Sequence, residues 1–237
     1  MSNKRYLVIL PTAFNPSKRL IASFEKKRIY QYINGLEKIY EISNAYKELD
    51  FVLVDNTISP NWQIPGELNK AIEKIPRLKK IFFFDNELPS RNKGCGNIIA
   101  WRKVFEEIDI SQYEYCIHFE PRQQLLNFSF FKQFIKKLGN YFRIMTYRKK
   151  ASTKNWAIRC ILKLIPLYGQ QFHTGLFSLE TKLFTKYAFQ VDINYFAEKK
   201  ICLEDDMFKK LRNKNIIRVE KLGLLWHDAF NDVNVEY

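Results

Sequence analysis

The strongest constraint on the fold is an alternation of short apolar runs with longer segments of helical periodicity. Apolar runs occupy residues 6–14, 51–54, 81–84 and 115–119, and polar residues follow each of them. Between the first two runs, residues 18–49 repeat apolar side chains at helical spacing. Short buried strands that alternate with helices are typical of a mainly parallel sheet covered on both faces. The sequence therefore predicts an α/β fold with helices on both sides of a central sheet.

The second half of the chain alternates less regularly. Residues 130–138 are amphipathic and predict a helix, whereas 141–147 and 174–179 have the composition of strands. A helix is also expected over 204–211, because three acidic residues open it and apolar residues continue it. No internal repeat, low-complexity tract or linker divides the 237 residues, so we expect a single domain, 1–237.

Polar side chains follow the predicted strands of the first half. In open parallel sheets the carboxyl ends of the strands meet at one edge, where ligands bind. The residues at these ends are Asn15, Asp55, Asp85, His118, Glu120 and Arg122. Residues two apart in a strand point to the same side, so His118 and Glu120 are expected to face one ligand together. Arg122 carries a planar cation that suits phosphate.

The formal net charge of +14 points to an anionic partner. A nucleic acid, an anionic membrane surface and a phosphorylated small molecule all satisfy this requirement. Lys and Arg are dispersed along the chain, and no zinc-finger, helix-turn-helix or RNA-recognition pattern occurs. We therefore expect no nucleic acid as partner, and a nucleic-acid-binding protein is kept as the alternative function.

Several features favour a cytoplasmic location. No segment approaches the roughly 18 apolar residues that span a bilayer, and the first residues indicate a strand rather than a signal peptide. The four cysteines form no CxxC pair. Residues 148–163 interleave six basic side chains with apolar ones, which predicts peripheral contact with an anionic membrane at its inner face. Alternatively, this apolar stripe packs on the core and the charges are solvated.

The order of these features resembles the GT-A fold of nucleotide-sugar glycosyltransferases, a Rossmann-like architecture. It is most similar to the large inverting family of bacterial polysaccharide and lipopolysaccharide enzymes. Members begin with a strand ending near Pro and Asn, as at Leu10–Asn15, and a second strand ends in an Asp, here Asp55. An Asn/Gly-rich loop before a helix matches residues 92–97. The family's DxD strand corresponds to His118-Phe119-Glu120, and its later acidic motif to Glu204-Asp205-Asp206.

The resemblance implies a glycosyltransferase with a donor-binding half over about 1–122 and an acceptor-binding half over about 123–237. Its implied reaction moves a sugar from a nucleotide-diphosphate sugar to an acceptor hydroxyl, saccharide or lipid-linked, in surface polysaccharide or glycolipid synthesis. The implied donor-binding residues are Pro11, Asn15, Asp55, Asn92, Lys93, Gly94, His118, Glu120 and Arg122. The implied acceptor-binding residues are His173, Thr174 and Gly175. Asp205 is the implied base, supported by Glu204 and Asp206.

The chain departs from the family at His118-Phe119-Glu120. The family's paired acids bind a cation that bridges the diphosphate, which implies Mn²⁺ or Mg²⁺ held here by Glu120 and His227. The departure also allows Arg122 to neutralise the diphosphate directly, or the chain to be a noncatalytic partner subunit with the same fold. Ordinary structural roles compete with the functional ones, such as a turn at Asp55 and a helix cap at Asn97.

Overall fold

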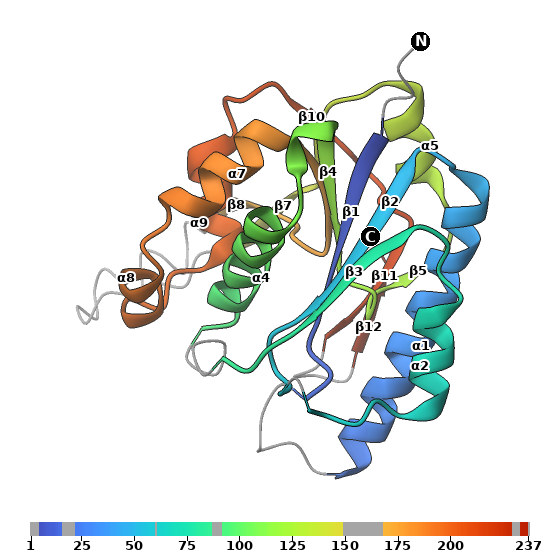
Figure 1. Ribbon diagram of the computed structural model, residues 1–237. Helices are drawn as coiled ribbons and strands as arrows, with labels where there is room; N and C mark the ends of the chain where they lie inside the picture. Colours follow the sequence, from blue (N-terminus) through green and yellow to red (C-terminus); the bar gives the residue numbers. More distant parts are fainter. Residues whose placement is uncertain are drawn as a thin grey trace.

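One seven-stranded sheet organises the chain, in the order β10-β6-β9-β4-β1-β2-β3 (Figure 1). The computed structural model describes residues 5–15, 22–59, 61–86, 92–148, 168–228 and 233–236. The strands of this sheet are β1 Arg5–Thr12, β2 Leu49–Asp55, β3 Leu78–Phe83, β4 Tyr113–Phe119, β6 Asn140–Phe142, β9 Leu176–Glu180 and β10 Ile216–Arg218. Strands β4, β1, β2 and β3 run parallel, whereas β9 is antiparallel to both β4 and β6. The prediction of a mainly parallel central sheet is confirmed.

Helices cover both faces of this sheet, and β1 shows how the sequence directs them. Tyr6, Val8 and Leu10 pack into one core, and the alternate residues Leu7 and Ile9 pack into the other. The first core contains side chains of α1 Ala22–Ala45, α2 Gly66–Glu73 and α5 Ser129–Lys136. The second contains side chains of α4 Lys93–Glu107, α7 Thr181–Gln190, α8 Ile193–Glu198 and α9 Leu203–Leu211. None of the helices described is long and apolar enough to cross a membrane.

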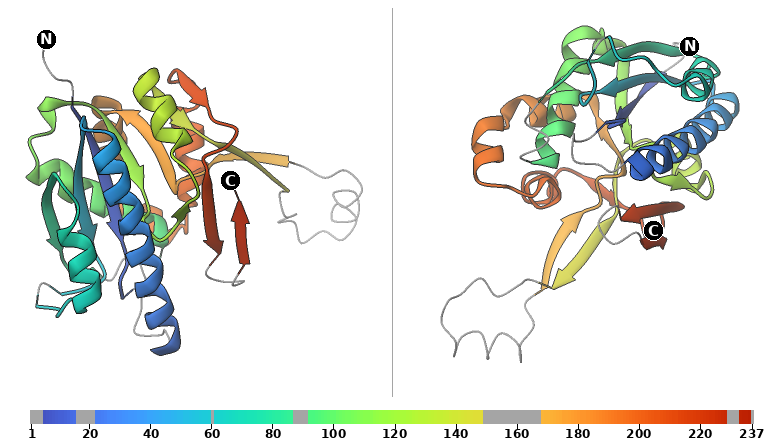
Figure 2. Two further views of the ribbon diagram at one scale, coloured as in Figure 1. Left: turned by 90° about the vertical axis from the view of Figure 1, so that its right-hand side faces the viewer. Right: turned by 90° about the horizontal axis from the view of Figure 1, so that it is seen from below.

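Two smaller sheets complete the fold. Strands β5 Gln124–Leu125, β11 Leu224–Asp228 and β12 Val233–Glu236 form one, and β7 Ile144–Arg148 pairs with β8 Tyr168–Phe172 in the other. Figure 2 shows the β7–β8 ribbon extending away from the body of the protein. A short 3-10 helix, Ile110–Gln112, precedes β4.

The strand predicted over 141–147 is in fact two strands in different sheets. Strand β6 ends at Phe142 and β7 begins at Ile144, so the chain leaves the main sheet at Arg143. The carbonyl of Phe142 accepts a hydrogen bond from the Val219 N–H, beyond β10, whereas that of Arg143 accepts one from the His173 N–H, beyond β8. Val219 and His173 lie far along the chain from these carbonyls. The apolar pattern of residues 141–147 therefore does not reveal that the chain passes from one sheet to another.

Helix α1 passes so close to the turn after β4 that Gly35 leaves no room for a side chain. A Cβ atom on Gly35 would lie 1.7 Å from the carbonyl oxygen of Pro121. We therefore expect Gly35→Ala to lower the free energy of unfolding by about 1–3 kcal/mol, because α1 must move away from that turn. Denaturant unfolding would measure the change, with the exposed neighbour Asn34→Ala as control. A Gly35→Ala protein as stable as the wild type would contradict this close packing.

Candidate functional site

The chain reverses its direction of travel across the sheet between β1 and β4. From β1 the sheet grows through β2 and β3 to one edge, and the later strands β4 and β9 lie on the other side of β1. In open α/β sheets, ligands bind outside the carboxyl ends of the strands at such a switch point. The segments that meet there are residues 12–15, after β1, and residues 118–122, at the end of β4. This edge is therefore our candidate site.

Asp55 holds the loop after β1 in place. Its Oδ2 accepts hydrogen bonds from Thr12 Oγ1 at 2.8 Å and from the Phe14 N–H at 2.7 Å. Its Oδ1 accepts from the backbone N–H and the hydroxyl of Thr57, at 2.8 and 2.6 Å. The resemblance assigned Asp55 a direct contact with the nucleotide, but four donors of the chain itself already occupy this fully buried carboxylate. Its geometry is that of a residue that shapes the loop.

Asn15 ends this loop with an unsatisfied acceptor. Its backbone N–H donates to Thr57 Oγ1 at 3.1 Å, and its side-chain Oδ1 is buried without a hydrogen-bond partner among the described residues. Buried polar atoms are nearly always paired, so a ligand donor is a natural partner for this oxygen. The nearby Pro11 lies buried within β1, and Ala13 is anchored by its N–H bond to the Tyr32 hydroxyl at 2.8 Å.

Glu120, just beyond β4, is fixed by three neighbouring segments. Its carboxylate accepts hydrogen bonds from Asn97 Nδ2 of α4 at 3.2 Å and from Gln123 Nε2 at 3.4 Å. Its backbone N–H donates to the Gly175 carbonyl at 2.9 Å. Its side chain is still 25% exposed, so the carboxylate reaches the surface of the site. Neither Asn97 nor Gln123 was predicted from the sequence as a site residue.

The charge of Glu120 follows from its surroundings. Burial alone would raise the pKa of its carboxyl, but the facing His118 ring, the Arg122 guanidinium and the Asn97 amide outweigh burial and lower the pKa to about 2. Glu120 is therefore an anion at neutral pH. An anion beside Arg122 at a strand end can hold a cation or accept a hydrogen bond from a hydroxyl group.

His118 lies directly behind this carboxylate, fully buried. Its Nδ1 accepts a hydrogen bond from the indole N–H of Trp101 at 2.9 Å. Its Nε2 lies 3.8 Å from Glu120 Oε1, beyond hydrogen-bonding distance. His118 and Glu120 thus lie on the same side of the chain at the end of β4, and that they face one ligand together stays a prediction.

The segment 92–97, predicted as a loop, is the first turn of α4. Asn92 is its N-cap: its Oδ1 accepts from the Gly94 N–H at 2.8 Å, and its Nδ2 donates to the carbonyls of Phe196 and Ile201. A Cβ on Gly94 would lie 2.9 Å from the Cβ of Leu203. Asn92 and Gly94 thus join α4 to α8 and α9, whereas the resemblance placed them against the donor.

The residues of α4 that reach the strand ends come slightly later. Asn97 contacts Glu120, and the Gly96 carbonyl accepts a hydrogen bond from Asn56 Nδ2 at 2.7 Å. Lys93, the remaining predicted residue of this segment, is exposed at the start of the helix. Asn92 and Asn97 are both residues that cap helices well and lie about one helical turn apart. Donor binding by Asn92, Lys93 and Gly94 stays a prediction.

The loop 173–175 connects the two halves of the site. Thr174 Oγ1 donates a hydrogen bond to Glu204 Oε1 of α9 at 2.9 Å, and the Gly175 carbonyl accepts one from the Glu120 N–H. His173 Nδ1 accepts the Gly175 N–H at 3.2 Å, and burial lowers the pKa of His173 to about 4, so the ring is neutral at neutral pH. The loop thereby places the acidic start of α9 next to the end of β4.

Specific partners hold Glu204 and Asp206 at the start of α9. Glu204 accepts from Thr174 and, at 3.0 Å, from the Cys202 thiol. Asp206 accepts from the Tyr187 hydroxyl at 2.8 Å and pairs with Lys210 at 3.0 Å. Asp205 stands between them in the first turn, partly exposed. Carboxylates are favoured at a helix N-terminus in any case, so their position alone does not show catalysis.

His227 can be placed only by its backbone. It belongs to β11, which pairs with β5 at Leu225 and Gln124 and continues in the direction of Arg122. The side chain of His227 lies outside the described residues, and so does its proposed bond to a metal ion. Within the described ranges, no group of three or more His, Cys, Asp and Glu side chains is arranged to hold a metal ion.

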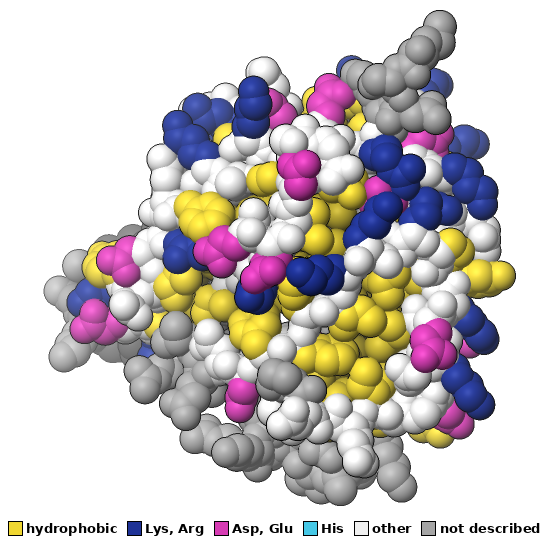
Figure 3. Space-filling view, viewed as in Figure 1, with side chains coloured by type: hydrophobic (Ala, Val, Ile, Leu, Met, Phe, Trp, Pro, Cys, Tyr) yellow, Lys and Arg dark blue, Asp and Glu magenta, His cyan; other side chains and the backbone are white. Residues whose placement is uncertain are grey.

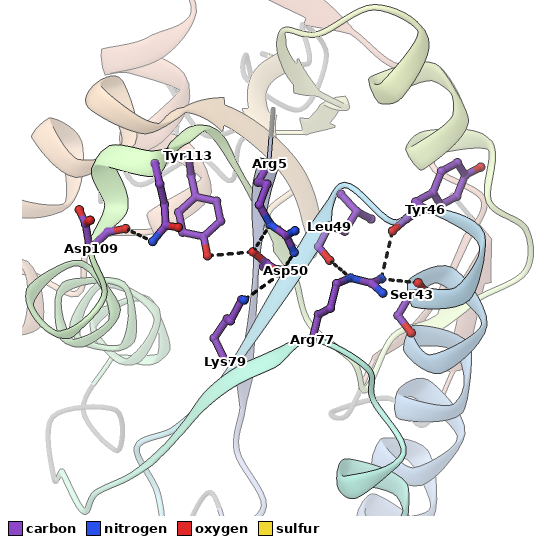
Figure 4. Close-up of polar contacts among 10 residues, drawn as sticks. Arg5, Ser43, Tyr46, Leu49, Asp50, Arg77, Lys79, Asp109 and Tyr113 are labelled. Atoms are coloured by element: carbon purple, nitrogen blue, oxygen red, sulfur yellow. Dashed lines mark hydrogen bonds and ion pairs between the residues drawn. The ribbon is translucent and has the colours of Figure 1, made fainter. Parts of the chain in front are cut away.

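The opposite edge of the sheet holds a buried ion pair. Asp50, at the start of β2, has a 1% exposed side chain that binds the Arg5 guanidinium through both oxygens. Tyr113 donates to the same carboxylate at 3.0 Å, and Lys79 approaches it at 3.6 Å (Figure 4). Figure 3 shows further Lys and Arg side chains gathered near this end of the sheet.

A cavity of about 780 Å³ lies beside this ion pair. Arg5 and Tyr113 line it from the amino ends of β1 and β4, and Lys182 and Lys186 line it from α7. None of its lining residues belongs to the site predicted from the sequence. It is therefore the natural competitor for an anionic ligand.

No protein-family model matches this sequence, and no curated protein matches it. Among solved structures, the fold is similar to a protein described as a nucleotide-diphospho-sugar transferase from Desulfovibrio desulfuricans G20. That match has 9% identity and a TM-score of 0.44, and covers 92% of this chain and 80% of the other. A second similar structure is the galactosyltransferase LgtC in complex with donor and acceptor sugar analogs, at 12% identity and TM-score 0.46, over 90% and 73% of the chains. Likenesses this remote leave the assignment of function to the residues of the site.

Proposed function

We propose that this chain is a glycosyltransferase that binds a nucleoside-diphosphate sugar at the carboxyl ends of β1 and β4. The observation that carries the proposal is the loop 173–175, which bonds to Glu120 on one side and to Glu204 on the other. It brings a donor-side anion and an acidic helix start together at the switch point, where a ligand is expected. A sugar-transfer site needs both kinds of group.

The reaction proposed for this site is an inverting displacement. The acceptor oxygen forms a bond to the anomeric carbon while the bond from that carbon to the diphosphate oxygen breaks. The nucleoside diphosphate leaves with the bonding electrons, and a carboxylate takes the proton of the acceptor hydroxyl. We assign that proton to Asp205, with Glu204 and Asp206 holding the start of α9 in place. Loop 173–175 is the proposed acceptor-facing segment.

The departing diphosphate needs positive charge near Glu120. Arg122 supplies it in the proposed site, and a bound Mn²⁺ or Mg²⁺ would add to it by neutralising the phosphate oxygens. Glu120 is the described group best suited to such a cation, because it remains ionised and partly exposed. Metal dependence is a matter for experiment: full activity in excess chelator would assign the charge to Arg122 and its neighbours.

A thermal-shift screen over nucleotide sugars, with and without Mn²⁺, tests the proposed function directly. A nucleotide sugar that binds the folded protein raises the melting temperature by mass action. A nucleic-acid-binding protein would instead bind DNA or RNA with an affinity that falls steeply as salt rises. A noncatalytic partner subunit would bind neither donor nor nucleic acid.

Replacing Arg122 with Ala is expected to weaken nucleoside-diphosphate binding by roughly 10-fold or more, because a charged hydrogen bond to phosphate is lost. Binding of the free nucleoside should hardly change. Calorimetry with both ligands measures the difference, and Lys136→Ala, which removes an exposed charge from α5, is the matched control. Equal weakening of nucleoside and diphosphate would remove Arg122 from the diphosphate site.

We further propose that the acceptor is carried on a lipid, in surface polysaccharide or glycolipid synthesis at the inner face of a membrane. The support is in the sequence: the basic and apolar residues of 148–163 connect the strands of the projecting β7–β8 ribbon (Figure 2). Residues 149–167, which include most of this basic and apolar segment, lie outside the described residues. Each basic residue near an anionic surface contributes about 1 kcal/mol, so several suffice for reversible binding.

Liposome flotation tests this membrane contact. The protein should float with anionic vesicles at low salt and remain behind with neutral ones. Changing Lys149, Lys150 and Lys154 to Glu should abolish flotation and spare transfer to a water-soluble acceptor. Equal flotation with anionic and neutral vesicles would refute the electrostatic contact.

A further inference from the structure

His118 has a hydrogen-bond donor that no described residue accepts. The indole N–H of Trp101 can only donate, so His118 Nδ1, which receives it at 2.9 Å, must offer a lone pair. The ring therefore carries its proton on Nε2. That atom is buried and has no partner among the described residues, and the nearest carboxylate oxygen, Glu120 Oε1, is 3.8 Å away.

The ring of His118 is held in this orientation by its packing. It stacks on Phe177, with centroids 4.8 Å apart and planes at 14°, and meets the Trp101 ring edge-on at 5.4 Å. Phe177 in turn stacks on Phe142 at 4.6 Å. A flat ring between fixed aromatic neighbours keeps Nδ1 toward Trp101 and Nε2 toward Glu120.

This arrangement does not fit a metal ion on His118. A metal ion needs the lone pair of a ring nitrogen, and in a neutral imidazole only one nitrogen offers a lone pair. Trp101 already occupies that nitrogen. Binding through Nε2 would require a doubly deprotonated ring, so the His-x-Glu sequence cannot act as a simple substitute for a pair of acidic ligands.

The pairing of a donor on His118 with an acceptor on Glu120 does fit a hydroxyl group. A hydroxyl oxygen can accept the Nε2–H and donate its own proton to the carboxylate at the same time. An oxygen about 2.8 Å from both atoms would lie to one side of the 3.8 Å line that joins them, and because Nε2 is buried, the ligand would have to displace the atoms that cover it. A phosphate oxygen could accept from Nε2 but would be repelled by the Glu120 anion.

We infer that His118 and Glu120 form a donor–acceptor pair that binds one hydroxyl of the sugar nucleotide. Trp101 is the positioning residue, because its bond to Nδ1 makes Nε2 of His118 the donor of the pair. The source of the hydroxyl rests on the proposed function. A ligand that lacks this hydroxyl would leave a buried donor unpaired, which makes the pair selective. Trp101 is one of the buried residues of α4.

Imidazole ¹⁵N NMR tests the tautomer without any ligand. The chain has three histidines, and His118→Gln identifies the signals of His118. At neutral pH we expect a protonated Nε2 and an unprotonated Nδ1, unchanged when Zn²⁺, the cation with a strong preference for imidazole, is added. A proton on Nδ1, or loss of the Nε2 proton to zinc, would overturn the inference. The tautomer is read on the wild-type protein, and the His118→Gln variant serves only to assign the signals.

Three probes in excess chelator then identify what the Nε2–H binds: inorganic diphosphate, UDP and UDP-glucose. A shift of the His118 Nε2–H signal with UDP indicates a ribose hydroxyl, and a shift only with UDP-glucose indicates a hydroxyl of the sugar. A shift with inorganic diphosphate, which has no sugar hydroxyl, or no shift with UDP-glucose that binds by calorimetry, would contradict the hydroxyl pair. If none of the probes binds, a uridine donor is excluded from the proposed function, while the tautomer result still decides the role of Trp101.

Discussion

Replacing Arg5 with Met is expected to lower the free energy of unfolding by about 3–5 kcal/mol, among the largest effects of any single change in this chain. The Asp50 carboxylate is 1% exposed and binds Arg5 through both of its oxygens. Met keeps much of the apolar stem but removes the charge, so a buried anion loses its closest partner. Among the described residues, Tyr113, at 3.0 Å, and Lys79, at 3.6 Å, remain beside it. Urea unfolding followed by circular dichroism would measure the loss.

Two matched variants separate the buried charge from other causes. Lys79 is 44% exposed and more distant from Asp50, so Lys79→Met should cost less than about 1 kcal/mol. The double variant Arg5→Met/Asp50→Leu leaves no unpaired buried charge and should recover much of the stability. A double variant as unstable as Arg5→Met alone would contradict this explanation. Ligand binding by the folded fraction should not change, because the ion pair lies at the edge opposite the candidate site.

Replacing Asp205 with Asn should lower turnover by roughly 10²-fold or more, the contribution typical of a general base. The amide keeps the size of the side chain but cannot take the proton of the acceptor hydroxyl. Affinity for the nucleotide sugar should remain nearly unchanged, because the donor is held at the ends of β1 and β4. Steady-state kinetics together with calorimetry separate the two effects.

The neighbouring acids provide the controls for this experiment. Asp206 is bound by Tyr187 and Lys210, so Asp206→Asn should affect turnover much less than Asp205→Asn. Glu204→Gln weakens the contact with Thr174 and tests whether loop 173–175 positions the site. Full turnover in a folded Asp205→Asn protein would show that another carboxylate takes the proton of the acceptor hydroxyl. Loss of donor affinity would place Asp205 on the donor side instead.

The sequence predicted those parts of the fold that depend on local pattern. The strands ending near Asn15, Asp55 and Glu120 were found because each is a short apolar run followed by polar residues. Their convergence on one edge follows from a parallel sheet. The helix beginning at Leu203 was expected because acids precede apolar residues at helical spacing.

The missed features depend on contacts between distant segments. Asn92 was distinguished from Asn97 as the cap of α4 only through its bonds to the Phe196 and Ile201 carbonyls, more than 100 residues away. Trp101 sits on the apolar stripe of α4, and its indole N–H has a partner only because β4 passes beside it. Asp50 interrupts an apolar run, so the second strand was predicted to start after it. The strand in fact includes Asp50, because the bond from Arg5 makes a buried carboxylate tolerable there.

A crystal structure with a bound nucleotide sugar would show at which edge of the sheet the ligand binds. We expect the diphosphate beside Arg122 and a hydroxyl of the ligand bonded to both His118 and Glu120, with the ring of the nucleoside near the loop after β1. We also expect the start of α9 to face the anomeric carbon. A ligand bound instead in the cavity lined by Arg5, Lys182 and Lys186, at the opposite edge of the sheet, would contradict the proposed site.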